Sequence, residues 1–252
     1  MPDDLGPRLR AHAADAGVRL LLIRRPGRAL VAPATHRVFA VSARPSAAWA
    51  ETTTFDDLGG ILDLDLAALR AGHSLGLEPH DHPVFAVCTH GRHDACCAER
   101  GRPVAAALAD AFPDETWEVS HMGGDRFAAN MLVAPDGLYY GRLDPESALA
   151  VAEARMRSQV ELDHLRGRTG YPMPVQAADI ALRRHLSLTA PLGPHLVAHT
   201  VDHGVTEATF ETAGERYLVR VRSTKSDAVT LTCRAARPQH ALQHEVLELA
   251  RL

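Results

Sequence analysis

The sequence predicts a mixed α/β fold of the α+β kind, and two observations support this class. Short apolar runs bounded by glycine and proline are interspersed with segments of helical periodicity, and the C-terminal part alternates apolar and polar residues. A chain of 252 residues can form one large domain or two modest ones. Its 46% apolar and 23% charged residues are typical of a soluble globular protein.

The N-terminal part is expected to be rich in strands. Apolar runs predict strands over 18–23, 29–32 and 38–41. The polar stretch 51–57 is interpreted as a connection to a helix near 62–70.

The central part shows a clear order of elements, which alternates strands that end on polar residues with irregular loops and helices. The expected elements are a buried strand 84–87 ending on Cys88, a loop 89–101, a helix from Pro103 to residue 112, a strand 116–120 ending at His121, a loop 122–130, a hairpin of strands 131–134 and 138–141, and a helix 145–156. This β–loop–α–β–loop–ββ–α order predicts a thioredoxin-like domain over roughly residues 80–158.

The C-terminal part follows a Gly/Pro-rich connection and a helix over 175–185. Period-two alternation predicts strands near 208–212, 217–221 and 229–233, and a closing helix over 241–252 completes a small βββα lobe. The predicted organisation is therefore a β-rich segment 1–78, a thioredoxin-like domain with trailing helices 79–190, and an α/β lobe 191–252.

Composition and charge indicate the cellular location and the kinds of partner that we expect. The first fifteen residues carry no apolar signal region, and no apolar run approaches the ~20 residues of a membrane span, so we expect a cytoplasmic protein without membrane insertion. A net charge of −4 gives no basic surface for nucleic acid. The sequence does not indicate an oligomeric state.

Cys88 and Cys97 form a C-x8-C pair on the loop that leads into the predicted helix at Pro103. A second loop begins with His121 and reaches Asp125 through Gly123 and Gly124. The strands before these loops are expected to end at the same sheet edge, and paired glycines allow close approach of the backbone. Thiolates with imidazole suit zinc or an iron–sulfur cluster, although structural zinc usually prefers C-x2–4-C spacing.

The other cysteines and nearby histidines have less distinctive surroundings. Cys96 is interpreted either as a ligand or as a packed or free thiol, and Cys233 as a core residue on a strand face. His90 and His93 are expected to be solvated loop residues.

Several ordered motifs resemble the sucrase/ferredoxin-like family, the thioredoxin-like [2Fe–2S] ferredoxins. They are CTHGRHDACCA from Cys88, SHMGGDRFA from Ser120, PDG from Pro135, YGR from Tyr140, and flanking segments at 20–27 and 166–178. The resemblance covers roughly residues 17–185. It implies a [2Fe–2S] cluster bound by C-x8-C plus H-x3-H, and an electron-transfer or redox-sensing protein with an unidentified redox partner, more an electron carrier than an enzyme.

This chain departs from that pattern at one ligand, because Asp125 stands where the family pattern has its second histidine. The implied ligands are therefore Cys88, Cys97, His121 and Asp125, with Cys96 or a loop histidine as a substitute for Asp125, or the cluster has been lost. Two other interpretations use the same residues: a structural zinc-binding interaction module, and a metal-free thioredoxin-like thiol protein. No pair of carboxylates marks a glycosidase site.

Overall fold

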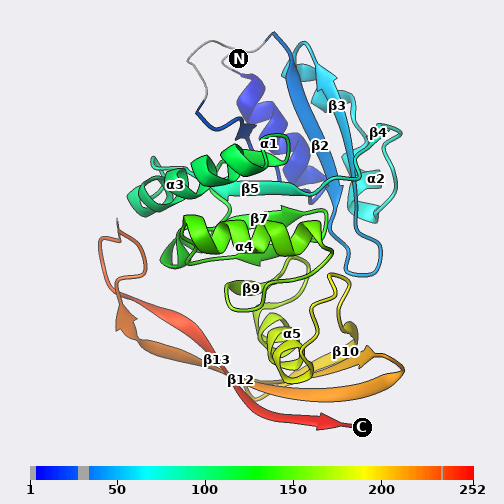
Figure 1. The fold of residues 1–252 in the computed structure, drawn as a ribbon, viewed down its shortest axis with the longest axis vertical. Helices are drawn as coiled ribbons and strands as arrows, with labels where there is room; N and C mark the ends of the chain where they lie inside the picture. The colour runs from blue at the N-terminus through cyan, green and yellow to red at the C-terminus, as the bar shows by residue number, and fades with distance from the viewer. Residues whose placement is uncertain (1–3, 28–33, 234) are drawn as a thin grey trace.

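The computed structural model describes residues 4–27, 34–233 and 235–252, and they form three sheets flanked by helices (Figure 1). With 29% helix and 34% strand, the structure confirms the mixed α/β class. The thioredoxin-like assignment and the division at residues 79 and 191 stay predictions. Within the described ranges, no helix is long and apolar enough to cross a membrane.

A six-stranded sheet forms the centre of the molecule, with strand order β1-β6-β5-β7-β8-β9. The only parallel pair that this sheet shows among the described residues is β5–β6, which α3 connects. The strands are β1 (Ile23–Arg24), β5 (Val84–Cys88), β6 (Thr116–Val119), β7 (Met131–Ala134), β8 (Leu138–Tyr140) and β9 (Leu165–Arg168). The predicted central strands and hairpin are thus confirmed, whereas the predicted strand 18–23 is wrong except at Ile23, because β1 consists of Ile23 and Arg24 alone.

Helices α3 (Ala95–Ala111) and α4 (Pro145–Met156) pack on one face of this sheet. Their contact contains Phe85 and Val87 of β5, Leu108 of α3, and Val151 of α4, all of them fully buried. Burying side chains of this size supplies roughly 1.5–3 kcal/mol each. This core fixes the position of the helix that carries Cys97.

Helix α3 begins eight residues earlier than the sequence predicts, so Cys97 lies in its first turn and not on a loop. The Asp94 side chain accepts a hydrogen bond from Cys96 N at 2.9 Å and caps the helix. Pro103 therefore lies inside the helix, where it cannot donate to the carbonyl of Glu99. Gly101 makes the close packing possible, because a Cβ there would collide with the carbonyl oxygen of Cys88.

The N-terminal part contains a three-stranded sheet of β2 (His36–Ser42), β3 (Trp49–Phe55) and β4 (Glu78–Pro79), with α1 (Leu5–Asp15), the 3-10 helix η1 (Leu58–Asp63) and α2 (Leu66–Ala71). Strand β2 confirms the predicted strand 38–41. The predicted strand 29–32 lies outside the described residues. The expected connection over 51–57 is wrong over most of its length, because β3 continues to Phe55. Glu51 is buried there and accepts backbone hydrogen bonds from Leu75 and Leu77.

The C-terminal part is an antiparallel sheet of order β10-β11-β12-β13, with α5 (Met173–Leu186) packed on one face. The strands are β10 (His195–Asp202), β11 (Val205–Thr212), β12 (Glu215–Val229) and β13 (Gln239–Arg251). The predicted βββα lobe is therefore wrong in its last two elements. Residues 230–233 lie outside the sheet, and the predicted helix 241–252 is replaced by β13, which extends to Arg251.

Strands β12 and β13 continue beyond the end of β11. The pairing of β11 with β12 stops at Arg222, whereas β12 and β13 remain paired from Ser223 and His244 to Val229 and Gln239. We call residues 223–244, including the connecting turn, the ribbon. In Figure 1 it leads from the C-terminal sheet back toward the start of α3.

Candidate metal centre

The ends of two parallel strands bring the predicted site together. Cys88 closes β5 and lies opposite Val119, the last residue of β6, and His121 follows two positions later. Cys97 enters from the first turn of α3. Carboxyl ends of neighbouring parallel strands lie at the same sheet edge, which is why two loops 33 positions apart in sequence converge here.

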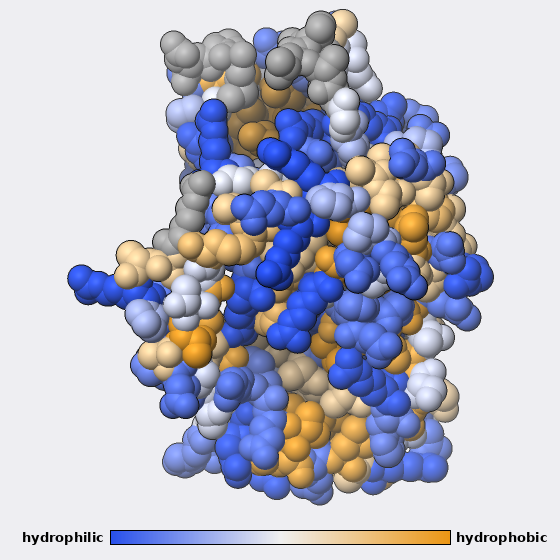
Figure 2. All heavy atoms as spheres, turned by 60° about the vertical axis from the view of Figure 1, so that its left-hand side comes forward, coloured by the Kyte–Doolittle hydropathy of each residue, from blue (hydrophilic) through white to orange (hydrophobic). Residues whose placement is uncertain are grey.

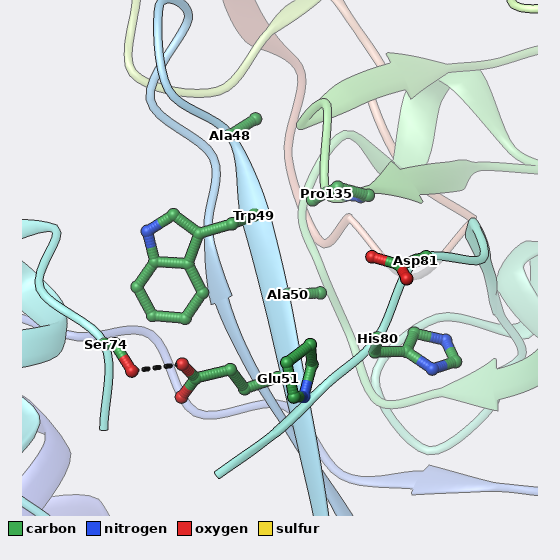
Figure 3. A pocket seen from close by; sticks show the side chains of 9 residues that line it. Ala48, Trp49, Ala50, Glu51, Ser74, His80, Asp81 and Pro135 are labelled. Atoms are coloured by element: carbon green, nitrogen blue, oxygen red, sulfur yellow. Dashed lines mark hydrogen bonds between the residues drawn. The ribbon is translucent and has the colours of Figure 1, made fainter. Parts of the chain in front are cut away.

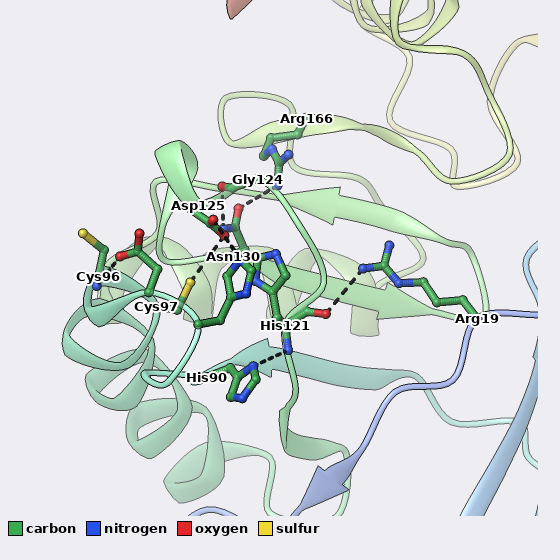
Figure 4. Close-up of polar contacts among 11 residues, drawn as sticks. Arg19, His90, Cys96, Cys97, His121, Gly124, Asp125, Asn130 and Arg166 are labelled. Atoms are coloured by element: carbon green, nitrogen blue, oxygen red, sulfur yellow. Dashed lines mark hydrogen bonds and ion pairs between the residues drawn. The ribbon is translucent and has the colours of Figure 1, made fainter. Parts of the chain in front are cut away.

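Cys88, Cys97 and His121 form one group whose ligand atoms all lie within 4.8 Å of one another. Each cysteine is 1% exposed, and neither forms a disulfide. Asp125 borders this group, with Oδ1 accepting from Cys97 Sγ at 3.8 Å and lying 3.2 Å from His121 Nδ1 (Figure 4). The structure thus brings together all four residues that the resemblance implies as ligands.

A second group shares His121 and consists of His93, His121 and Asp125. His93 Nε2 lies 3.3 Å from Asp125 Oδ2, and the His93 and His121 rings stack with centroids 3.6 Å apart. His93 was expected to be a solvated loop residue, and its side chain is 47% exposed, but it also contacts His121 and Asp125. The sequence feature that indicates this role is the position of His93 between Cys88 and Cys97.

Hydrogen bonds fix the two loops relative to each other. The His121 backbone N–H donates to His90 Nδ1 at 3.3 Å, so His90 also belongs to the site and not to solvent alone. The Asn130 side chain donates to the Gly124 carbonyl at 2.9 Å and accepts from Arg166 Nη1 at 2.6 Å. Gly124 has φ +79°, and a Cβ there would collide with the Arg166 guanidinium. Gly123 and Gly124 are therefore both favoured by the positive φ of the turn, and Gly124 also by the close packing of Arg166.

Burial sets the charges of the site. It raises the pKa of the Cys97 thiol, with further contributions from the neighbouring Cys88 and Asp125. It lowers the pKa of His121, against the opposing effect of Asp125, and it lowers the pKa of Arg166 to about 10. Without a cation, the thiol and the imidazole are therefore held in their neutral forms.

The donor set fits a metal. His121 Nδ1 is buried without a hydrogen-bond partner, since its contact with Asp125 lacks hydrogen-bond geometry. Buried polar atoms are normally paired, and a cation bound among these sulfur, nitrogen and oxygen donors would satisfy the unpaired nitrogen. Two thiols, imidazole and carboxylate suit zinc or iron.

Cys96 is directed away from this centre (Figure 4) and forms a disulfide with Cys233. Its use as a substitute fourth ligand stays a prediction, but in the structure its sulfur is engaged elsewhere. Cys233 is exposed in the turn of the ribbon, so its interpretation as a core residue is wrong. The Asp94 carboxylate lies within 4.8 Å of both sulfurs.

Two hollows lie outside the centre. A groove of about 710 Å³ runs beside the cysteine loop, between β1, β6 and α3, and includes His90. A cavity of about 370 Å³ lies between β3 and Pro135 and is lined by Trp49, Glu51 and His80 (Figure 3). Neither contains Cys88, Cys97 or His121 among its lining residues.

The fold and the site define an α/β protein with a candidate Cys/His/Asp metal centre at the end of two parallel strands. The sucrase/ferredoxin-like family matches residues 24–167, more than half of the chain, and the chain belongs to this family. All four implied ligands fall inside the matched range, whereas Cys233 falls outside it. Neither the curated proteins nor the solved structures include a match to this chain.

Proposed function

We propose that this protein binds a [2Fe–2S] cluster through Cys88, Cys97, His121 and Asp125, and that it serves as a one-electron carrier or redox sensor. The observation that carries the proposal is the pair of overlapping donor groups, one with two sulfurs and one with imidazole and carboxylate, which share His121. A cytoplasmic location and an unidentified redox partner protein complete the proposal.

The division of donors into two groups favours a binuclear centre. In [2Fe–2S] proteins with mixed ligands, one iron takes the cysteines and the other takes the non-sulfur ligands. Cys88 and Cys97 supply the first pair, and His121 and Asp125 supply the second. When bound, the cluster supplies reversible one-electron chemistry.

Asp125 is favoured over His93 as the fourth ligand because its carboxylate reaches both halves of the site. Its oxygen atoms contact Cys97 Sγ, His121 Nδ1 and His93 Nε2, and its side chain is 12% exposed. The His93 side chain is 47% exposed. His93 therefore covers the outer side of the site, where it shields Asp125 from water.

The surrounding residues determine how the site responds to an electron. Burial of Cys88 and Cys97 excludes water from the sulfurs, and the cationic Arg166 lies behind Asn130 and Gly124. An imidazole in place of a thiolate makes the ligand set less negative and favours the reduced form. His121 has two ring nitrogens, so one can bind metal while the other holds a proton, which couples reduction to pH.

Zinc is the second candidate, because two cysteines, one histidine and one carboxylate are all zinc ligands and suit a single tetrahedral ion. In that case the protein is a structural zinc-binding interaction module. The metal-free thiol interpretation has less support, since Cys88 and Cys97 are buried and form no disulfide.

Purification without oxygen, followed by iron, acid-labile sulfide and zinc analysis, tests the proposal. We expect a red-brown protein with bands in the range of roughly 400–550 nm and iron and sulfide in equal amounts. The Cys233→Ser variant, whose change lies outside the ligand set, should retain both. A colourless protein with one zinc per chain would refute the cluster and leave the zinc module.

A further inference from the structure

We propose that Cys96 and Cys233 form a reversible thiol–disulfide site that fastens the ribbon to the first turn of α3, beside the metal centre. This site is independent of which metal the centre holds. It assigns a role to the two cysteines that the cluster proposal does not use.

The ribbon has little hydrophobic packing of its own. Beyond Arg222 it is a two-stranded hairpin, and such hairpins are marginally stable in water unless they pack on other elements. Among the described ribbon residues, Ala241 is the one buried apolar side chain, whereas Val229 and Leu242 are exposed. Its position must therefore depend on the attachments that it makes.

Those attachments lead to residues next to the candidate ligands. The disulfide joins Cys233 to Cys96, the neighbour of Cys97. A second contact joins the Leu242 carbonyl to Arg126 Nη2 at 3.5 Å, and Arg126 is the neighbour of Asp125. The ribbon thus bridges the first turn of α3 and the His121–Asp125 loop.

The exposure of the four cysteines separates this pair from the metal ligands. Cys233 is exposed and Cys96 is half-buried, whereas Cys88 and Cys97 are both 1% exposed. Thiol–disulfide exchange requires access of an attacking thiolate to a sulfur. A dithiol reductant can therefore reach the Cys96–Cys233 bond without entering the metal centre.

Asp94 holds the Cys96 end of the disulfide in place. Asp94 is 1% exposed, and its Oδ2 has no hydrogen-bond partner, while Oδ1 caps α3 through Cys96 N. Asp94 is held by its capping role, so the exposed turn that carries Cys233 is the part free to move.

The chemical step balances as a two-electron exchange. A dithiol reductant transfers two electrons and two protons, the Cys96–Cys233 bond breaks to give two thiols, and the reductant closes its own disulfide. A more oxidising disulfide reverses the step. Reduction then breaks the covalent link between the ribbon and the first turn of α3, next to Cys97.

Peptide mapping and hydrogen exchange on the full chain test the proposal. After mild oxidation, thiol alkylation and digestion should yield a peptide that links Cys96 to Cys233, and after dithiothreitol both residues should be alkylated. Amide exchange in 223–229 and 239–244 should accelerate by about tenfold or more on reduction, as expected when a locally held segment opens. Exchange in β5 and β7 should not change.

Variants distinguish the effect of losing the disulfide from the effect of a general loss of stability. Cys233→Ser and Cys96→Ser should each show fast ribbon exchange that no longer responds to dithiothreitol, while Thr224→Ser, an exposed change in the ribbon, should behave as the unchanged chain. Unlinked Cys96 and Cys233 in the oxidised protein, or ribbon exchange that is equally slow before and after reduction, would overturn the proposal. The visible spectrum, recorded on the same samples, reports separately whether a cluster is present.

Discussion

His121 Nδ1 lies 3.2 Å from Asp125 Oδ1, and the chain between them turns back through two glycines in left-handed backbone conformations. Gly123 and Gly124, with φ of +93° and +79°, allow this reversal, which residues with a Cβ adopt only under strain. The turn therefore brings the Asp125 carboxylate next to His121. Asp125 is also the position at which the pattern described above has its second histidine.

Substitution of Asp125 tests its role as a ligand. Asp125→His should retain the cluster and raise its midpoint potential, because a neutral imidazole replaces a negative carboxylate. Asp125→Ala should lower cluster content by about tenfold or more, in line with the loss of a metal-orienting group. Iron and sulfide analysis with potentiometric titration measures both. If neither substitution changes content or potential, Asp125 is not a ligand.

Loss of either buried cysteine should abolish metal binding. Cys88→Ser and Cys97→Ser each remove one of the two sulfurs that lie within 4.8 Å of His121. Metal content per chain after purification is the measurement, and Cys233→Ser is the matched control because it removes a sulfur outside the centre. Full metal content in Cys97→Ser would exclude the C-x8-C pair as the ligand source.

Arg166 should tune the potential of the centre through its charge. Its pKa of about 10 keeps the guanidinium positive at neutral pH, and it lies behind Asn130 next to the Asp125 loop. Removing a positive charge disfavours the reduced cluster, so Arg166→Gln should lower the midpoint potential by tens of millivolts, on the order expected for charges several ångströms apart in protein. Arg184→Gln, which removes the same charge from α5, should leave the potential unchanged.

A lower pH should increase amide exchange in the ribbon. Burial first, and then the charge of Arg126, lower the pKa of His244, which contacts Ser223 Oγ through Nδ1 at 3.0 Å. A histidine with a lowered pKa stabilises the folded state while neutral, and this contribution is lost as pH falls through its ordinary value of about 6.5. Amide exchange around residues 223 and 244, corrected for intrinsic rates, should therefore increase from pH 7.5 to pH 5.5. His244→Gln should remove the pH dependence.

Gly101→Ala should destabilise the protein and displace the site. The new Cβ would collide with the carbonyl oxygen of Cys88, which pushes α3 away from β5 at the point where Cys88 and Cys97 meet. Overpacking of this kind costs about 1–3 kcal/mol in the free energy of unfolding. Denaturant unfolding measures it, with Ala106→Ser on the exposed side of α3 as the control. An unchanged midpoint would show that the contact between α3 and β5 is not as tight as the structure indicates.

The sequence predicted the elements whose apolar residues face a single core, such as β5, β7 and α4. It failed where distant partners decide the local structure. Residues 241–252 contain alanine, leucine, glutamine and glutamate, which favour a helix, yet pairing with β12 makes them a strand. In β3, Glu51 is buried because backbone groups of Leu75 and Leu77 bind it, and no local pattern shows those partners.

The sequence predicted which residues form the candidate site, but not the contacts that they make. Cys88, Cys97, His121 and Asp125 do lie together, but their roles as ligands stay predictions. Neither the stacking of His93 on His121 nor the pairing of Cys96 with Cys233 follows from spacing. Both contacts depend on the tertiary structure, which places the two loops and the C-terminal ribbon next to one another.

The position of Cys96 and Cys97 at the start of one helix has a consequence for maturation of the chain. Successive helical side chains point about 100° apart, so one sulfur faces the buried centre and its neighbour faces the ribbon. Four cysteines allow three sets of two disulfides. A metal bound by Cys88 and Cys97, as proposed, would protect these two sulfurs from oxidation and would leave Cys96 and Cys233 as the pair that can form a disulfide.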